Sequence, residues 1–272
     1  MTENLKDFFS LISYAFSEIF YGSCVNLVMI LAFLWGIIWG SFGGTILYRS
    51  IHNISIIQPH FSFCPNCKRK LKWFHNIPLL SYIILQGKCA YCKKKIEITY
   101  FISELLSGIV GIFCAIFSES FIDFLGMFFF VWGILIASIS DVKFLLVPLL
   151  SVLFSSLGAI IKIVETKDIM NSAFGAAFGA GSFLFIKIAY KLVRKREGLG
   201  EGDVIFMIPV GLYLGLFGTI LSLVFSSFLG GLTGTIITVI SKRKEFPFIP
   251  FIFISVVMVI VIKKTFPNFS FL

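Results

Sequence analysis

The sequence predicts an all-α, multi-pass membrane protein: a helical bundle with about eight transmembrane helices and a zinc-ribbon-like cytoplasmic loop between the first two. Three observations predict this class. The 272 residues are 58% hydrophobic, only 14% are charged, and several stretches reach the roughly 20 apolar residues that a spanning helix requires. A soluble domain of this size needs a far larger polar share to cover its surface.

The apolar stretches alternate with loops that differ in charge. The expected spans are residues 25–48, 99–117, 121–140, 145–162, 170–190, 203–217, 219–240 and 247–262. The loops after the first, third, fifth and seventh spans, together with the end of the fifth span, hold 18 of the 23 lysines and arginines, which places these loops in the cytoplasm and the N-terminus outside. The net charge of +9 therefore reflects topology and contact with anionic membrane lipid. No basic helix with interleaved stacking aromatics is present, so nucleic acid is not expected as a partner.

Four segments follow from this pattern. Residues 1–24 lack a basic start and carry acids, so they are not a cleavable signal, and their helical spacing of apolar residues predicts an interfacial amphipathic segment. The alternative is an outer extension of the first span, 25–48. Residues 49–98 form the cytoplasmic loop, and residues 99–272 form a membrane domain of seven helices. The sequence does not indicate an oligomeric state.

Small residues recur at helical spacing in two of the spans. Gly36, Gly40 and Gly44 are four residues apart in the first span, as are Gly175 and Gly179 in the fifth. Small residues at this spacing let helix backbones approach closely in lipid. The pattern predicts a tightly packed bundle and no more.

The loop 49–98 contains two C-x-x-C pairs, Cys64 with Cys67 and Cys89 with Cys92. Two residues between cysteines let both sulfurs face one metal ion, and two such pairs complete a tetrahedral shell. A closed shell leaves no position for water. The pattern therefore predicts a structural zinc ion, which supplies the folding free energy that a loop with few apolar residues lacks.

The sequence gives less support to other interpretations of these cysteines. Two disulfides are the alternative, which the reducing cytoplasm disfavours. His52, His60 or His75 could replace a ligand, although four well-spaced thiols need no replacement. Cys24 and Cys114 lie outside the loop and are interpreted as small apolar residues of the membrane helices, and whether they pair is left open.

Three acids lie in or beside a predicted span. A charged side chain there costs about 2.5–3.5 kcal/mol of insertion free energy, so each is a functional candidate. Asp141 ends the third span and Asp203 begins the sixth, so both are expected at the cytoplasmic face and at similar depth. Glu104 lies within the second span and is interpreted as a structural anchor, hydrogen-bonded to a neighbouring helix.

The pair of Asp141 and Asp203 predicts acid–base chemistry. Two carboxyl groups in one low-dielectric site do not both ionise readily, so one proton is held between them, and in aspartic proteases such a pair activates water and protonates the leaving group. The glycines of "GLGEGD" would let a substrate strand or a partner helix contact Asp203. These glycines are Gly198, Gly200 and Gly202. The alternative is that each acid merely reaches water from a helix end, with a favourable helix dipole at Asp203.

Other functions fit parts of the pattern. An alternating-glycine loop also cradles nucleotides or S-adenosylmethionine, but such a loop follows a buried strand, whereas here it follows the cationic helix end "KIAYKLVRKRE". An ion or small-molecule transporter with a regulatory zinc loop would carry acids near the bilayer midplane and an internal repeat. A non-catalytic scaffold would tolerate loss of both aspartates. The acids at one face favour an enzyme.

The chain resembles the type IV prepilin leader peptidases, membrane aspartic proteases of the G-x-G-D type. The resemblance rests on motifs that occur in the family's order over most of residues 36–210. They are "GSFGGTILYR", the cysteine loop with "WFHNIPLLSYIILQGKC" between its pairs, "ITYFISELLSG", Asp141 followed by Pro148, and "GLGEGD".

The resemblance implies that Asp141 and Asp203 are the catalytic pair and that residues 99–272 form a peptidase domain in a bacterial cytoplasmic membrane. It implies prepilin or pseudopilin substrates, cleaved at the cytoplasmic side of their apolar helix. Many members also methylate the new N-terminal residue with S-adenosylmethionine, and the cysteine loop is associated with these bifunctional forms. The residues that would bind S-adenosylmethionine are not indicated.

The chain departs from the family pattern at two positions. Leu149 stands where some members have an acid, and Ile205 stands where many have lysine. Neither change touches the aspartate pair, but contacts with the substrate are expected to differ. Glu201, which does not share a helix face with Asp203, is expected to attract the basic leader.

Overall fold

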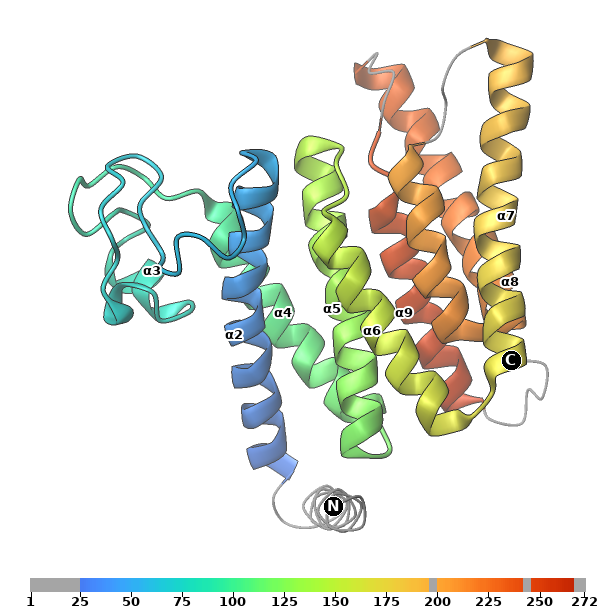
Figure 1. Ribbon diagram of the computed structural model, residues 1–272, viewed down its shortest axis with the longest axis horizontal. Helices are drawn as coiled ribbons and strands as arrows, with labels where there is room; N and C mark the ends of the chain where they lie inside the picture. The colour runs from blue at the N-terminus through green and yellow to red at the C-terminus, as the bar shows by residue number, and fades with distance from the viewer. Residues whose placement is uncertain (1–24, 196–199, 242–245, 267–272) are drawn as a thin grey trace. The chain divides into compact units, whose positions relative to one another are not determined.

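The structure, a computed structural model, describes residues 25–195, 200–241 and 246–266 (Figure 1). In these ranges the regular secondary structure is helical, and two isolated bridges pair Phe63 with Lys70 and Lys88 with Lys95. The chain divides into two compact units, Ser23–Ala115 and a unit that includes Ile116–Leu272. The predicted amphipathic segment 1–24 lies outside the described residues.

The first unit contains two long helices joined by the cysteine loop. They are α2 (Val25–Ile51) and α4 (Ile98–Phe117), and the loop contains the 3-10 turn η1 (Trp73–His75) and the short helix α3 (Leu80–Ile84). A Cβ atom at Gly36 would meet the backbone of Ser107, and one at Gly40 would meet the Cα of Glu104. The close approach predicted from the glycine spacing is thus confirmed between α2 and α4.

The second unit is built around one buried helix. Its helices are α5 (Phe121–Phe144), α6 (Leu149–Thr166), α7 (Ile169–Arg194), α8 (Glu201–Ser241) and α9 (Ile249–Thr265). Ser120 caps the start of α5, where its Oγ accepts the N–H of Asp123, and Leu145 caps the end of the helix in the left-handed conformation. Large side chains such as Trp132 and Phe128 are fully buried along it, so α5 forms the core.

Helix α8 is interrupted at Gly215, where φ is 71° and ψ is −178°. The Oδ1 atom of Asn171 accepts the N–H of Leu216 at 2.9 Å, which satisfies an amide at the break. A Cβ atom at Gly179 of α7 would meet both Met207 and Thr219, although these would lie about 18 Å apart along a straight helix. The chain therefore reverses at Gly215 and packs both arms of α8 against α7.

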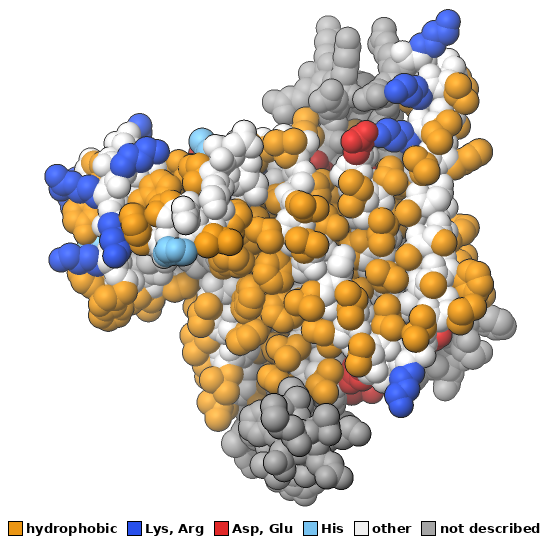
Figure 2. Space-filling view, in the orientation of Figure 1, with side chains coloured by type: hydrophobic (Ala, Val, Ile, Leu, Met, Phe, Trp, Pro, Cys, Tyr) orange, Lys and Arg blue, Asp and Glu red, His pale blue; other side chains and the backbone are white. Residues whose placement is uncertain are grey.

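Six described helices are long and apolar enough to cross a membrane, namely α2, α4, α5, α6, α7 and α8. The all-α bundle predicted from the sequence is confirmed, and the chain is a multi-pass membrane protein. Of the eight expected spans, the sixth and seventh are the two arms of α8, and the eighth is α9, which has 17 residues. Figure 2 shows hydrophobic side chains over most of the visible face of α5–α7, with charged side chains near the helix ends.

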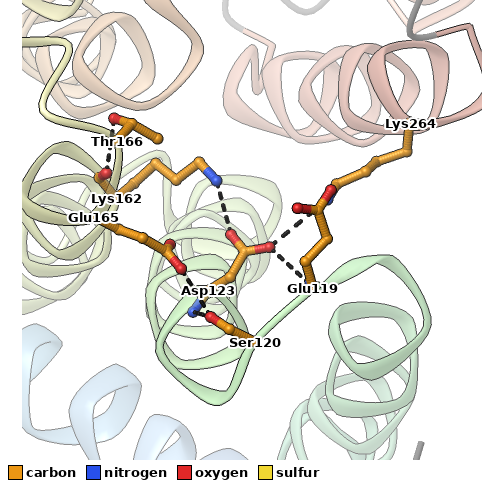
Figure 3. Close-up of polar contacts among 7 residues, drawn as sticks. All are labelled: Glu119, Ser120, Asp123, Lys162, Glu165, Thr166 and Lys264. Atoms are coloured by element: carbon orange, nitrogen blue, oxygen red, sulfur yellow. Dashed lines mark hydrogen bonds and ion pairs between the residues drawn. The ribbon is translucent and has the colours of Figure 1, made fainter. Parts of the chain in front are cut away.

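A buried ion cluster joins three helices at one end of the second unit (Figure 3). Asp123 of α5 is only 2% exposed, and its carboxylate lies 2.9 Å from Nζ of Lys162 in α6 and 3.7 Å from Nζ of Lys264 in α9. Lys264 also pairs with Glu119 at 2.7 Å. Asp141 lies 18 residues further along α5, about 27 Å away. The cluster therefore marks the end of the unit opposite to Asp141.

Candidate active site and cysteine cluster

Asp141 is buried near the C-terminal end of α5, with 7% of its surface exposed. Its Oδ2 atom accepts the backbone N–H of Ile249 at 3.0 Å, and the N–H of Phe248 also donates to the carboxylate. Both donors belong to the start of α9. Sequence reasoning missed these two positions, because the donors are backbone groups that every non-proline residue carries.

Asp203 lies in the first turn of α8 and is half-buried. Its Oδ2 atom accepts the N–H of Gly200 at 3.3 Å. A Cβ atom at Gly202 would collide with the side chain of Val147, in the connection that follows α5. Close approach at this glycine therefore brings the start of α8 against the segment just after Asp141. Gly198 lies outside the described residues.

The fold brings the two acids to the same end of the second unit. The carboxylates of Asp141 and Asp203 lie close enough to interact electrostatically. Deeper in the bundle, the rings of Phe130 in α5 and Tyr213 in the first arm of α8 stack with their centroids 3.9 Å apart. The catalytic roles of the pair stay a prediction.

A charged pair connects the first turn of α8 to α7. The Glu201 carboxylate is 3.2 Å from Nζ of Lys187 in α7, and the Glu201 side chain is 86% exposed. Exposed pairs of this kind contribute about 0–1 kcal/mol to stability. Glu201 therefore remains accessible to a cationic ligand.

The four thiols of the loop converge on one point. The sulfur atoms of Cys64, Cys67, Cys89 and Cys92 all lie within 4.8 Å of one another, and Sγ of Cys64 is 3.9 Å from Sγ of Cys92. A tetrahedral zinc ion with Zn–S bonds of about 2.3 Å requires sulfurs about 3.8 Å apart, so the cluster fits this metal. None of the three histidines considered as ligands belongs to the cluster.

The two C-x-x-C pairs fold in the same way. The N–H of Cys64 donates to the carbonyl of Arg69, and the N–H of Cys89 donates to the carbonyl of Lys94. No disulfide joins the described cysteines, so the disulfide alternative gains no support. The backbone N–H of Lys94, followed by the Asn66 amide, lowers the pKa of Cys92 to about 6. This thiol is therefore mainly ionised at neutral pH, as metal binding requires.

Glu104 connects the loop to α4. Its Oε2 atom accepts the backbone N–H of Leu79 at 2.7 Å, just before α3, and Ser41 of α2 also lies within hydrogen-bonding reach. The expected anchor to a neighbouring helix is thus present, and the loop is a second partner. Sequence reasoning missed the loop contact because it joins segments with no shared pattern.

Together these features define a multi-pass helical membrane protein with two acids at one end of a bundle and a separate four-thiol cluster. Residues 34–118 match the family described as "Bacterial Peptidase A24 N-terminal domain", and residues 128–235 match the "Type IV leader peptidase family". No solved structure matches the chain.

Curated relatives carry the name "Prepilin leader peptidase/N-methyltransferase". The one from Neisseria gonorrhoeae is 31% identical over 202 residues, which cover 71% of this chain and 68% of that protein. The one from Vibrio cholerae is 28% identical and covers 69% and 78%, and the one from Bacillus subtilis is 28% identical and covers 80% and 88%. The chain belongs to the type IV leader peptidase family, which confirms the family and the enzyme class predicted from the sequence.

Proposed function

We propose that this chain is a membrane aspartic endopeptidase that removes the short basic leader of type IV prepilins or pseudopilins. The cleavage takes place at the cytoplasmic face of a bacterial cytoplasmic membrane, with the N-terminus of the chain outside. The observation that carries the proposal is the meeting of Asp141 and Asp203 at one end of the bundle in a member of a leader peptidase family.

In this proposal the two carboxyl groups share the acid–base work. The ionised carboxyl takes a proton from the attacking water while the protonated one donates its proton to the carbonyl oxygen. When the C–N bond breaks, the first carboxyl passes the proton from water to the leaving amine. The second carboxyl recovers its proton from the hydroxyl of the tetrahedral intermediate, so the pair returns to its starting state. A prepilin places its scissile bond where its apolar helix emerges from the bilayer. A pair at the end of α5 and the start of α8 meets that bond without unfolding the helix. Glu201 attracts the basic leader.

The four-cysteine cluster holds a structural zinc ion in this proposal. The two C-x-x-C pairs supply four thiolates and leave no ligand position for water. The ion therefore stabilises the loop and does not take part in cleavage. The names of the relatives support a second activity, methylation of the new N-terminal residue. S-adenosylmethionine supplies the methyl group in that reaction.

The test uses purified enzyme in lipid with a synthetic prepilin and labelled S-adenosylmethionine. Asp141→Asn and Asp203→Asn are each expected to lower leader cleavage by about 10²–10⁴-fold, since each removes one partner of the acid–base pair. Both variants are expected to transfer label to a precut substrate at the rate of the unaltered enzyme. Cleavage retained by either variant would end the proposal.

A further inference from the structure

The cysteine loop exposes a set of large apolar side chains that lie near one another in sequence, here called the apolar patch. Their exposed fractions are Trp73 80%, Phe74 45%, Leu80 57%, Ile83 61% and Ile84 76%. The last three share one face of α3, because they lie three and four residues apart. Tryptophan and isoleucine this exposed in a loop are typical of a surface that contacts lipid or protein.

Helix α3, which carries part of the patch, lies beside the first turns of α4, a candidate membrane span. Glu104 binds the backbone N–H of Leu79, and the rings of Tyr82 and Phe101 have centroids 5.2 Å apart. Helix α4 begins at Ile98, so Glu104 lies about 9 Å along a candidate membrane span. The two contacts therefore hold α3 beside the first turns of a transmembrane helix.

The loop that carries this patch is rich in basic side chains. Between residues 52 and 98 the only acid is Glu97, whereas eight residues are lysine or arginine, all of them exposed. They are Lys68, Arg69, Lys70, Lys72, Lys88, Lys93, Lys94 and Lys95. On the face in Figure 2, basic side chains lie along the outer side of this loop and hydrophobic ones gather at its lower edge. A cationic surface next to exposed tryptophan and isoleucine matches anionic headgroups above an acyl layer.

We propose that the apolar patch inserts into the anionic headgroup interface of the membrane that the chain itself spans. The lysines and arginines then contact lipid phosphates, and Trp73 takes the interfacial position that tryptophan prefers. The lipid surface, together with Glu104, fixes the orientation of the four-cysteine cluster against the membrane. This contact is independent of the proposed enzymatic activity.

The experiment measures where Trp73 lies. The full chain is reconstituted in vesicles of phosphatidylethanolamine and phosphatidylglycerol whose acyl chains carry bromine, which quenches tryptophan on contact. The emission lost in Trp73→Phe isolates Trp73 from the other three tryptophans. Bromine near the headgroup end of the acyl chain is expected to quench Trp73 more than bromine near the methyl end. Replacing phosphatidylglycerol by phosphatidylcholine is expected to lower the quenching at least about twofold.

Two matched variants test the patch itself. Ile83→Ser/Ile84→Ser is expected to reduce quenching of Trp73 by bromolipid, whereas Ile83→Leu/Ile84→Leu is expected to preserve it. Bound zinc, measured in each variant, shows that the loop has kept its fold. Quenching of Trp73 by aqueous acrylamide but not by bromolipid would overturn the proposal. The proposal would also be overturned if neither acrylamide nor bromolipid quenched Trp73 and this protection increased with the protein-to-lipid ratio. That result would indicate that a second copy of the chain covers the patch.

Discussion

The backbone N–H of Ile249 donates a 3.0 Å hydrogen bond to Oδ2 of Asp141, which lies 108 positions earlier in the chain. The bond joins the start of α9 to the end of α5. Because Asp141 is buried, the bond restricts the orientation of a carboxylate that we propose to be catalytic. Hydrogen bonds to charged groups contribute about 1.5–3 kcal/mol, so this one is strong enough to matter for a reaction.

Removing this donor is expected to slow cleavage. Incorporating the α-hydroxy acid of isoleucine at position 249 turns the amide into an ester, which lacks the N–H and keeps the Ile249 side chain. The kcat for leader cleavage is expected to fall about 10–100-fold, because the carboxylate of Asp141 loses its orientation, while KM changes little. Both constants are measured with a synthetic prepilin.

The control for this experiment is the same ester at Val256, which is buried in the middle of α9. This change also weakens the helix but does not touch Asp141. It is expected to lower the Tm without lowering kcat. Equal losses of kcat with the two esters would show that the bond to Asp141 has no special role.

The cysteine cluster predicts a sharp difference between two cysteines of the same unit. Cys89→Ser is expected to release most of the bound zinc and to make residues 49–98 sensitive to protease, because the shell loses a ligand. Cys114→Ser, in the buried face of α4, is expected to keep the zinc. Metal content of the purified proteins is the measurement. Full zinc occupancy in Cys89→Ser would rule out the four-thiol shell.

The helical framework was predictable because apolar run length and the membrane thickness fix where helices begin and end. The expected break between the sixth and seventh spans was at residue 218, whereas the reversal in α8 lies three residues earlier, at Gly215, because glycine adopts the backbone conformation of the turn without strain. The convergence of Asp141 and Asp203 followed from counting spans. The hydrogen bonds from the N–H of Ile249 to Asp141 and from the N–H of Leu79 to Glu104 could not be predicted, because their donors are backbone groups, which carry no signal in the sequence.

Substitution at Gly215 is expected to destabilise the protein. The backbone there has φ of 71° and ψ of −178°, and a Cβ atom would meet the side chain of Asn171. Gly215→Ala is therefore expected to lower the free energy of unfolding by about 1–3 kcal/mol. Gly181→Ala in α7 is the control, because nothing lies within 4 Å of the added Cβ atom. The Tm values in detergent compare the two, and an equal change in both would contradict the strained turn.

Glu201 is expected to affect substrate binding and not the chemical step. Glu201→Gln removes an exposed negative charge in the first turn of α8. The KM for a prepilin with a basic leader is expected to rise a few-fold at low salt, and the difference is expected to shrink as salt screens the attraction. A prepilin with a neutral leader is the control. Unchanged KM and salt dependence in the variant would exclude attraction of the leader by Glu201.

The ion cluster at the opposite end is expected to hold the bundle together. Lys162→Met leaves the Asp123 carboxylate, which is almost fully buried, without its 2.9 Å partner and with Lys264 at 3.7 Å. The expected loss of stability is about 1–3 kcal/mol, because a buried acceptor loses its donor. Lys167→Met, at an exposed position just after α6, is the control and is expected to change stability by less than about 0.5 kcal/mol. Adding Asp123→Asn to Lys162→Met is expected to restore part of the loss, since it removes a buried charge whose remaining cationic partner, Lys264, is 3.7 Å away. Thermal unfolding of the four proteins separates the cost of losing this pair from the cost of losing any lysine, and equal Tm values for Lys162→Met and Lys167→Met would show that the buried pair adds nothing.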